Sequence, residues 1–315
     1  MGPLSSRRPP RPAPALGRLL VLLVALGPAP LPAHNSPDHN AEAVTARLAR
    51  EGRSAALLCE RAHHYRELGR LADAEADLAA ACELAPGDLD AANQLARVQF
   101  QRGDTTRARQ TLDRALPRAR SAGERAPLWL TRAEVRAAAQ DYAAALADCE
   151  QAFAASDPDL DWFLLRAQLQ LRAGRPADAA AGLRRGFEET GNAVLEAEWI
   201  EALIDAGQAT EALGRIEGPL AASRWRSSWL LRRARARLAL GDRVRARGDL
   251  HEAVRELDSR LVATRPDPSL LLDRGLARAL LGDRTAARAD LDQARRSGAE
   301  AAATWRLESE LAATR

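Results

Sequence analysis

Small and apolar residues recur along this chain at fixed distances from a series of evenly spaced turns. Alanine stands five residues after every turn, an apolar residue stands nine after it, and a small or apolar residue stands seven before it. Positions five, nine and twelve after a turn share one face of a helix. The pattern therefore predicts helical hairpins, pairs of antiparallel helices joined at the turns. The turns align at Gly69, Gly103, Gln140, Gly174, Gly207, Gly241 and Gly282, with steps of 34, 37, 34, 33, 34 and 41 residues.

The same marker residues return from unit to unit. They include Ala62, Gly69, Ala74, Leu78, Ala81 and Pro86 in the first unit and Trp129, Ala133, Tyr142, Ala145 and Ala152 in the third. In this arrangement the chain resembles the tetratricopeptide repeat (TPR) family. The resemblance implies an all-α fold, a right-handed α-solenoid of antiparallel helical hairpins. It predicts about seven TPR-like repeats over residues 54–298. A polar linker and a short leading helix are expected in residues 34–53, and a C-terminal capping helix in residues 299–315.

Two departures from the regular pattern predict local irregularity. The longer steps place extra residues at 120–127 and 257–268, where we expect hinges. Pro219 stands next to Gly218 where the second helix of the fifth unit should continue, so we expect that helix to end early or kink.

Arginine and aspartate recur together in the repeats. Arginine stands eight residues before the turn in five units, and aspartate follows sixteen residues later in four of them. These positions lie at similar height on the two helices of a hairpin, so we predict bridges that fix the register of the helices more than they add net stability. Solvated charges with coincidental spacing are the alternative. The fifth arginine, Arg166, faces Gly182 and should find another acceptor or solvent. The predicted pairs are Arg61 with Asp77, Arg132 with Asp148, Arg233 with Asp249 and Arg274 with Asp290.

The charge of the chain is divided unevenly. The first 33 residues hold four of the 46 basic residues and none of the 43 acidic ones, which leaves 42 against 43 elsewhere. Because the basic surplus lies at the N-terminus, we expect no nucleic-acid partner. Residues 1–33 have the layout of a secretory signal peptide: a basic start, an apolar run and a plausible cleavage after Ala33. The run is about half of the ~20 residues that a bilayer span needs, so we expect export to the periplasm or the cell exterior without an integral membrane anchor.

Few residues are suited to catalysis or metal binding. The chain has five histidines and three cysteines, and it lacks a glycine-rich phosphate loop and the GxSxG, HExxH and CxxC motifs. We therefore expect no enzyme activity, no cofactor and no metal site. His63 and His64 are adjacent and, if helical, point about 100° apart, so they should not share a metal easily. Cys59 and Cys82 lie at similar height in the first hairpin, where either a disulfide or two buried thiols would fit.

The resemblance to TPR proteins also implies a binding groove on the concave wall, which is formed by the first helix of each repeat. A protein or peptide partner is expected there, although the same positions could simply be exposed. A clamp for a C-terminal carboxylate is not expected, because Cys59 and His63 stand where its lysine and asparagine set should begin. The implied groove residues are His63, Arg66, Asn93, Arg97, Phe100, Glu134, Gln168, Arg172, Glu201 and Arg235.

Together these features favour an exported, non-enzymatic scaffold or adaptor that binds a protein or peptide in its groove. Two alternatives stay open. One is an accessory subunit permanently assembled into a cell-envelope complex or with itself. The other is a regulatory or catalytic protein whose site only the folded chain creates. The sequence identifies neither the partner nor the oligomeric state.

Overall fold

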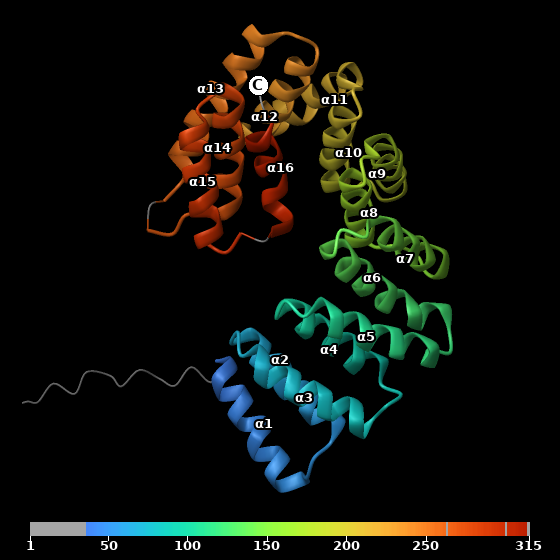
Figure 1. The fold of residues 1–315 in the computed structure, drawn as a ribbon. Helices are drawn as coiled ribbons and strands as arrows, with labels where there is room; N and C mark the ends of the chain where they lie inside the picture. Colours follow the sequence, from blue (N-terminus) through green and yellow to red (C-terminus); the bar gives the residue numbers. More distant parts are fainter. Residues whose placement is uncertain (1–35, 263, 300, 314–315) are drawn as a thin grey trace, which may run out of the picture.

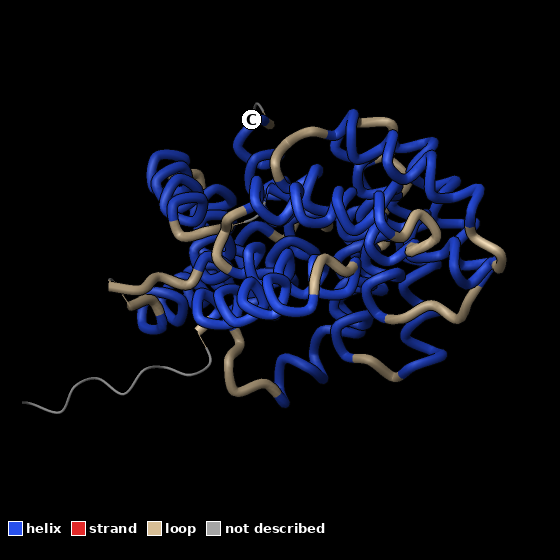
Figure 2. The backbone as a smooth tube through the Cα atoms, turned by 90° about the horizontal axis from the view of Figure 1, so that it is seen from below, coloured by secondary structure: helices blue, strands red, loops and turns tan. Residues whose placement is uncertain are grey.

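The computed structural model describes residues 36–262, 264–299 and 301–313, and within these ranges the chain is helical and contains no strand (Figure 2). The predicted all-α fold, a superhelix of helical repeats, is confirmed. The signal peptide expected over residues 1–33 lies outside the described residues. The helices are α1 (Pro37–Glu51), α2 (Ala55–Glu67), α3 (Leu71–Leu84), α4 (Leu89–Gln101), α5 (Thr105–Ala115), the 3-10 helix η1 (Leu116–Arg118), α6 (Ala122–Ala138), α7 (Tyr142–Ala155), α8 (Leu160–Arg172), α9 (Pro176–Thr190), α10 (Ala193–Asp205), α11 (Ala209–Ala222), α12 (Ser227–Ala239), α13 (Arg243–Arg260), α14 (Pro268–Leu281), α15 (Arg284–Arg296) and α16 (Ala301–Ala312).

Helices α2 to α15 follow one another as pairs, from α2 with α3 to α14 with α15, and the pairs stack along an arc (Figure 1). The first helices of successive pairs from α4 to α14 also contact one another. No comparable contacts join successive second helices in the described part of the chain. The first helices are therefore closer together than the second helices, which curves the stack and places the first helices on its inner wall.

Alanine allows the two helices of each pair to approach closely. The alanine five residues after each turn is fully buried in every pair. A larger side chain there would hold the helices apart, since protein interiors are close-packed and leave little space to fill. These alanines are Ala74, Ala108, Ala145, Ala179, Ala212, Ala246 and Ala287.

The turns between paired helices share one geometry. The aligned glycines have positive φ values, for example 71° at Gly69 and 83° at Gly241. Gln140, which replaces glycine in the third turn, keeps the same left-handed conformation with φ 61°. A side chain is disfavoured there, so this turn carries some backbone strain. After most turns an aspartate accepts a hydrogen bond from the backbone N–H three residues on, as Asp242 does from Arg245, which caps the second helix.

The extra residues mainly lengthen helices. Helix α6 has 17 residues and begins at Ala122, within the segment expected to be a hinge. Helix α13 has 18 residues and extends to Arg260, which absorbs part of the second insertion. The expected early end of the fifth unit's second helix is wrong, because α11 runs past Pro219 to Ala222. Leu220 is buried beyond the proline, and this packing together with a bond from the Ser223 N–H to the Pro219 carbonyl completes the last turn.

Two glycines inside helices should respond oppositely to alanine. A β-carbon at Gly248 would meet no atom within 4 Å, whereas one at Gly186 would lie 2.8 Å from Cδ1 of Phe163 and 3.0 Å from Cδ1 of Leu195. We expect Gly248→Ala to raise the free energy of unfolding by about 0.5–1 kcal/mol, because alanine restricts the unfolded chain and favours helix. Gly186→Ala should lower it by about 1 kcal/mol, because overpacking exceeds that gain. Urea denaturation of both variants checks this, and stabilisation by both would contradict the tight packing around Gly186.

Candidate functional site

The inner face of the arc holds an open cavity of about 1120 Å³. Side chains from α4, α6, α8, α10, α12 and α14 line it, and α16 closes one side. Its apolar lining includes Leu164, Leu231, Leu276 and Trp305. Such a mixture of apolar surface and a few polar groups is typical of ligand sites. Six of the implied groove residues line the cavity, namely Arg97, Phe100, Glu134, Gln168, Arg172 and Glu201.

Charged side chains line the groove along its length. Arg97 on α4 donates a hydrogen bond from Nε to Oγ1 of Thr131 at 3.2 Å, which holds its guanidinium at the N-terminal end. Arg172 on α8 lies further along. At the other end the lining contains the carboxylates of Glu201 on α10 and Asp273 on α14. Arg232 and Arg306 line the cavity beside these carboxylates, and Glu134 on α6 and Asp161 on α8 line it as well, so charges of both signs face the groove along its length.

Four implied groove residues do not line this cavity. His63 on α2 is exposed and pairs with Glu67, and a buried atom of Arg66, Nε, has no hydrogen-bond partner among the described residues. Asn93 is buried, and Arg235 is held by Glu201 and Asp205 on α10. Position in the repeat alone did not distinguish these side chains. Neighbouring helices bury Asn93 and hold Arg235, whereas His63 and Arg66 lie on α2, which contributes no residue to the cavity lining.

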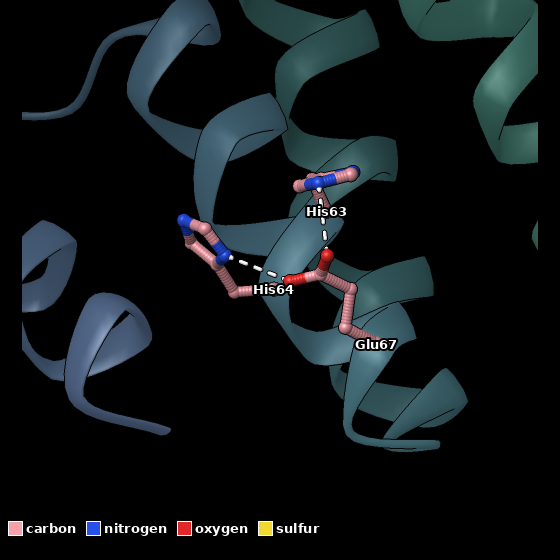
Figure 3. A group of neighbouring side chains, drawn as sticks. All are labelled: His63, His64 and Glu67. Carbon is pink, nitrogen blue, oxygen red and sulfur yellow. Dashed lines mark hydrogen bonds and ion pairs between the residues drawn. The ribbon is translucent and has the colours of Figure 1, made fainter. Parts of the chain in front are cut away.

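The adjacent histidines form a group with Glu67 toward the C-terminal end of α2 (Figure 3). Nε2 of His63 lies 3.4 Å from one carboxylate oxygen and Nδ1 of His64 lies 3.2 Å from the other. All three ligand atoms lie within 4.8 Å of one another. The angle of about 100° between the two histidines therefore does not keep their ring nitrogens apart, contrary to what the sequence analysis had expected. The reason is that rotation about the side-chain bonds moves the ring nitrogens, whatever the angle between the Cα–Cβ bonds. These residues could hold a divalent cation with water as a further ligand.

Each of the four predicted arginine–aspartate pairs lies together in the structure. In every pair the guanidinium donates from both Nε and NH2 to the two carboxylate oxygens, with distances of 2.7 and 2.7 Å for Arg61 and 3.0 and 2.7 Å for Arg132. The distances are 3.2 and 2.8 Å for Arg233 and 3.1 and 2.6 Å for Arg274. All four aspartates are buried, so these are bidentate bridges between the two helices of a hairpin.

A second arginine, which the sequence analysis missed, completes three of the bridges. One helical turn after the first arginine, Arg136, Arg237 and Arg278 each donate from NH1 to the same aspartate, at 2.7, 2.6 and 2.9 Å. The recurrence of arginine four residues after Arg132 and Arg274 was visible in the sequence and could have indicated this. Each buried carboxylate in these three units is therefore held by two positive charges.

Arg166 shows how the fourth unit manages without an aspartate. Its guanidinium lies over the ring of Phe153, 3.9 Å from the centroid, and its nearest carboxylate oxygen, on Glu150, is 3.9 Å away. NH2 lies 3.1 Å from the place where a β-carbon of Gly182 would stand. Burial lowers the pKa of Arg166, with Glu150 opposing this. The face of the Phe153 ring thus takes the place of the missing aspartate, so the Arg166 guanidinium does not depend on solvent alone.

A cluster of buried charges lies at the C-terminal end of the groove. Glu201 accepts hydrogen bonds from Arg235 and Arg306, and Nε of Arg232 forms an ion pair with it at 3.2 Å. Asp205 accepts a bond from Arg235 at 2.5 Å. Burial raises the pKa of Asp205 although Arg306 lowers it, and burial also lowers the pKa of Arg235. Both directions reflect the cost of keeping charges away from water.

The cysteines are free thiols in the structure; Cys149 is buried, whereas Cys59 and Cys82 are partly buried. Burial raises the pKa of Cys59 to about 11 and that of Cys149 to about 12. Since the thiolate is the reactive form, neither residue is suited to nucleophilic chemistry at neutral pH.

Comparison with known proteins agrees with this fold. The tetratricopeptide repeat family matches residues 65–126, from the end of α2 to the start of α6. A tetratricopeptide repeat protein from Parabacteroides merdae ATCC 43184 is similar over 82% of this chain and 98% of its own, with 17% identity and a TM-score of 0.60. Yeast Tom70 is similar over 86% of this chain and 57% of its own, with 16% identity and a TM-score of 0.54. The fold is thus that of TPR proteins. None of the curated proteins compared with the chain matches it.

Among the described residues, no helix has the length and apolar character needed to cross a membrane.

Proposed function

We propose that this protein is a non-enzymatic scaffold that binds a protein or peptide along its inner groove, and that it acts after export to the periplasm or the cell exterior. The observation that carries the binding proposal is the cavity of about 1120 Å³, which residues from six successive first helices line. Its volume and mixed lining suit a peptide segment. The layout of residues 1–33 supports export.

Charge in the groove supports a peptide that carries acidic groups. Arg97 and Arg172 favour such groups, whereas Glu201 is buried and already paired with Arg232, Arg235 and Arg306. Phe100 and Leu164 add apolar surface near the arginines. Aromatic and arginine side chains are the residue types that most often dominate binding energy at interfaces.

The test begins with a peptide library displayed on phage and selected on the purified chain. The selected peptide is labelled, and its binding to wild type, Phe100→Ala and Arg172→Ala is measured by fluorescence anisotropy. We expect each substitution to weaken binding by about tenfold, because each removes an anchor from the groove.

Arg255→Ala is the matched control, since Arg255 is exposed on the second helix α13 and does not line the cavity. It should leave the dissociation constant unchanged. Equal binding by wild type, Phe100→Ala and Arg172→Ala would show that the peptide binds elsewhere and would contradict the proposal.

A further inference from the structure

The C-terminal helix α16 lies on the inner side of the arc as well as at its end. It contacts α14 more extensively than α15, and Figure 1 shows it between α14 and α10. Trp305 and Arg306 on α16 line the groove together with residues of α10 and α14. The helix therefore occupies part of the surface to which we assign ligand binding.

One face of α16 is packed against the last hairpin. Leu307 and Leu311 are buried in a cluster that includes Leu276 on α14. A β-carbon at Gly275 would lie only 2.6 Å from Cδ2 of Leu307. The corresponding position seven residues before the turn is alanine or isoleucine in the other six units. The last hairpin thus has a glycine where α16 inserts a leucine.

Arg306 joins α16 to a helix about a hundred residues earlier in the chain. Its guanidinium donates to the buried Glu201 and, at 3.5 Å, to Asp205, across sequence separations of 105 and 101 residues. Asp273 on α14 also lines the cavity; burial raises its pKa, while Arg232, Arg260 and Arg306 lower it. Arg306 is therefore placed among three carboxylates that come from two first helices.

The charge of this end of the groove favours a cation from outside α10, α12 and α14. Four carboxylates, those of Glu198, Glu201, Asp205 and Asp273, surround two arginines from α12, Arg232 and Arg235. A third arginine, Arg260 on α13, also acts on Asp273, so one negative charge is left uncompensated when α16 is left out. A guanidinium is well suited to such a place, because its fork of donors can bind two carboxylates at once.

The connection to α16 is short and contains a glycine. Gly298 has φ 93° and lies between α15 and α16. Beyond it, α16 is a 12-residue helix that is held by one apolar face, by Arg306 and by two arginines of α15. Arg295 pairs with Glu308, and Arg284 donates to the carbonyl oxygens of Leu311 and Ala313. Its displacement opens none of the hairpins, because α16 is not one of the paired helices α2 to α15.

We propose that the groove between α10 and α14 recognises an amphipathic helix carrying an arginine next to a leucine, and that α16 is its built-in occupant. A partner protein that presents such a helix competes with α16 for Glu201, Asp205 and the leucine site at Gly275. This inference rests on the proposed function, and it specifies the chemistry of the ligand at one end of the groove.

The test uses the full chain and a fluorescein-labelled synthetic peptide with the sequence of residues 301–313. Arg306→Glu places a negative charge against Glu201 and Asp205, which should release α16. We expect the Arg306→Glu chain to bind the peptide at least about tenfold more tightly than wild type does. The same peptide carrying Arg306→Glu should bind neither chain.

Arg295→Glu is the matched control. Arg295 pairs with Glu308 at 2.9 Å, so this substitution also breaks an ion pair of α16, but both side chains are about half exposed and do not line the groove. Peptide binding by Arg295→Glu should equal that of wild type.

Hydrogen exchange gives a second measurement on the same chains. The amides of residues 301–313 should exchange faster in Arg306→Glu than in wild type, and no faster in Arg295→Glu. Should Arg306→Glu fold poorly, Arg306→Ala is used in its place. We expect Arg306→Ala also to bind the peptide more tightly than wild type and to exchange the amides of residues 301–313 faster.

Equal peptide binding by wild type and Arg306→Glu, or equal binding of the two peptides to Arg306→Glu, would overturn the inference. The outcome of the library experiment distinguishes a failure of this inference from a failure of the proposed function. If the library-selected peptide still depends on Phe100 and Arg172, the groove is a binding site whose C-terminal end does not recognise this helix. If both peptides bind without regard to any groove residue, both proposals are wrong.

Discussion

Replacing Asp148 with alanine is expected to lower the free energy of unfolding by about 3 kcal/mol, the lower end of the range for breaking a buried ion pair. Asp148 is only 3% exposed, and its carboxylate accepts hydrogen bonds from Arg132 and Arg136. Its removal leaves two guanidinium groups without their shared acceptor, although Arg132 keeps Asp113 at 2.8 Å. Chemical denaturation of wild type and Asp148→Ala measures the difference.

A double-mutant cycle then tests the bridge itself. We expect the combined Arg132→Ala and Asp148→Ala variant to lose clearly less stability than the sum of the single variants, because removing both partners leaves fewer unpaired charges. Asp113→Ala is the control: that side chain is 46% exposed, so its loss should cost less than about 1 kcal/mol. Additive losses in the cycle would mean that Arg132 and Asp148 act independently, and the predicted role in hairpin register would be lost.

Leu195→Ala is expected to be comparably destabilising, by about 3 kcal/mol, because it leaves a cavity in the largest apolar cluster. Leu195 on α10 is fully buried and lies near Gly186 and Phe163, which belong to the preceding hairpin. Its side chain therefore joins neighbouring pairs rather than the two helices of one pair. Thermal or urea unfolding would measure the loss.

Val244→Ala on α13 provides the comparison, since Val244 is 86% exposed and should change the free energy of unfolding by less than about 0.5 kcal/mol. Similar effects of the two substitutions would mean that contacts between pairs contribute little. In a stack held by nearest-neighbour contacts, that result would be inconsistent with the fold described here.

The sequence was most informative about features that repeat. Fully buried alanines such as Ala74 recur at helical spacing in every unit, so the all-α hairpin fold followed from the pattern. The pairing of Arg274 with Asp290 followed from their positions in the sequence, since each lies eight residues from the turn at Gly282. Both depend on geometry within one hairpin, where a spacing in sequence nearly fixes a spacing in three dimensions.

Features that depend on several hairpins together were not predictable in this way. The contact of Arg306 with Glu201 spans 105 residues, and it depends on the curvature accumulated over the intervening hairpins. The repeat pattern of the sequence does not reveal that curvature. The same reason explains why Phe100 and Arg172 line the groove while Asn93 does not. Packing of neighbouring helices decides which first-helix residues stay open to a ligand.

The central claim is that the inner wall of the arc is the surface that binds a partner. A crystal structure of the chain with the library-selected peptide tests it most directly. We expect the peptide to lie along the first helices, in contact with Phe100 on α4 and Arg172 on α8. A peptide bound to the second helices on the outer face, with the inner groove unchanged, would contradict the account.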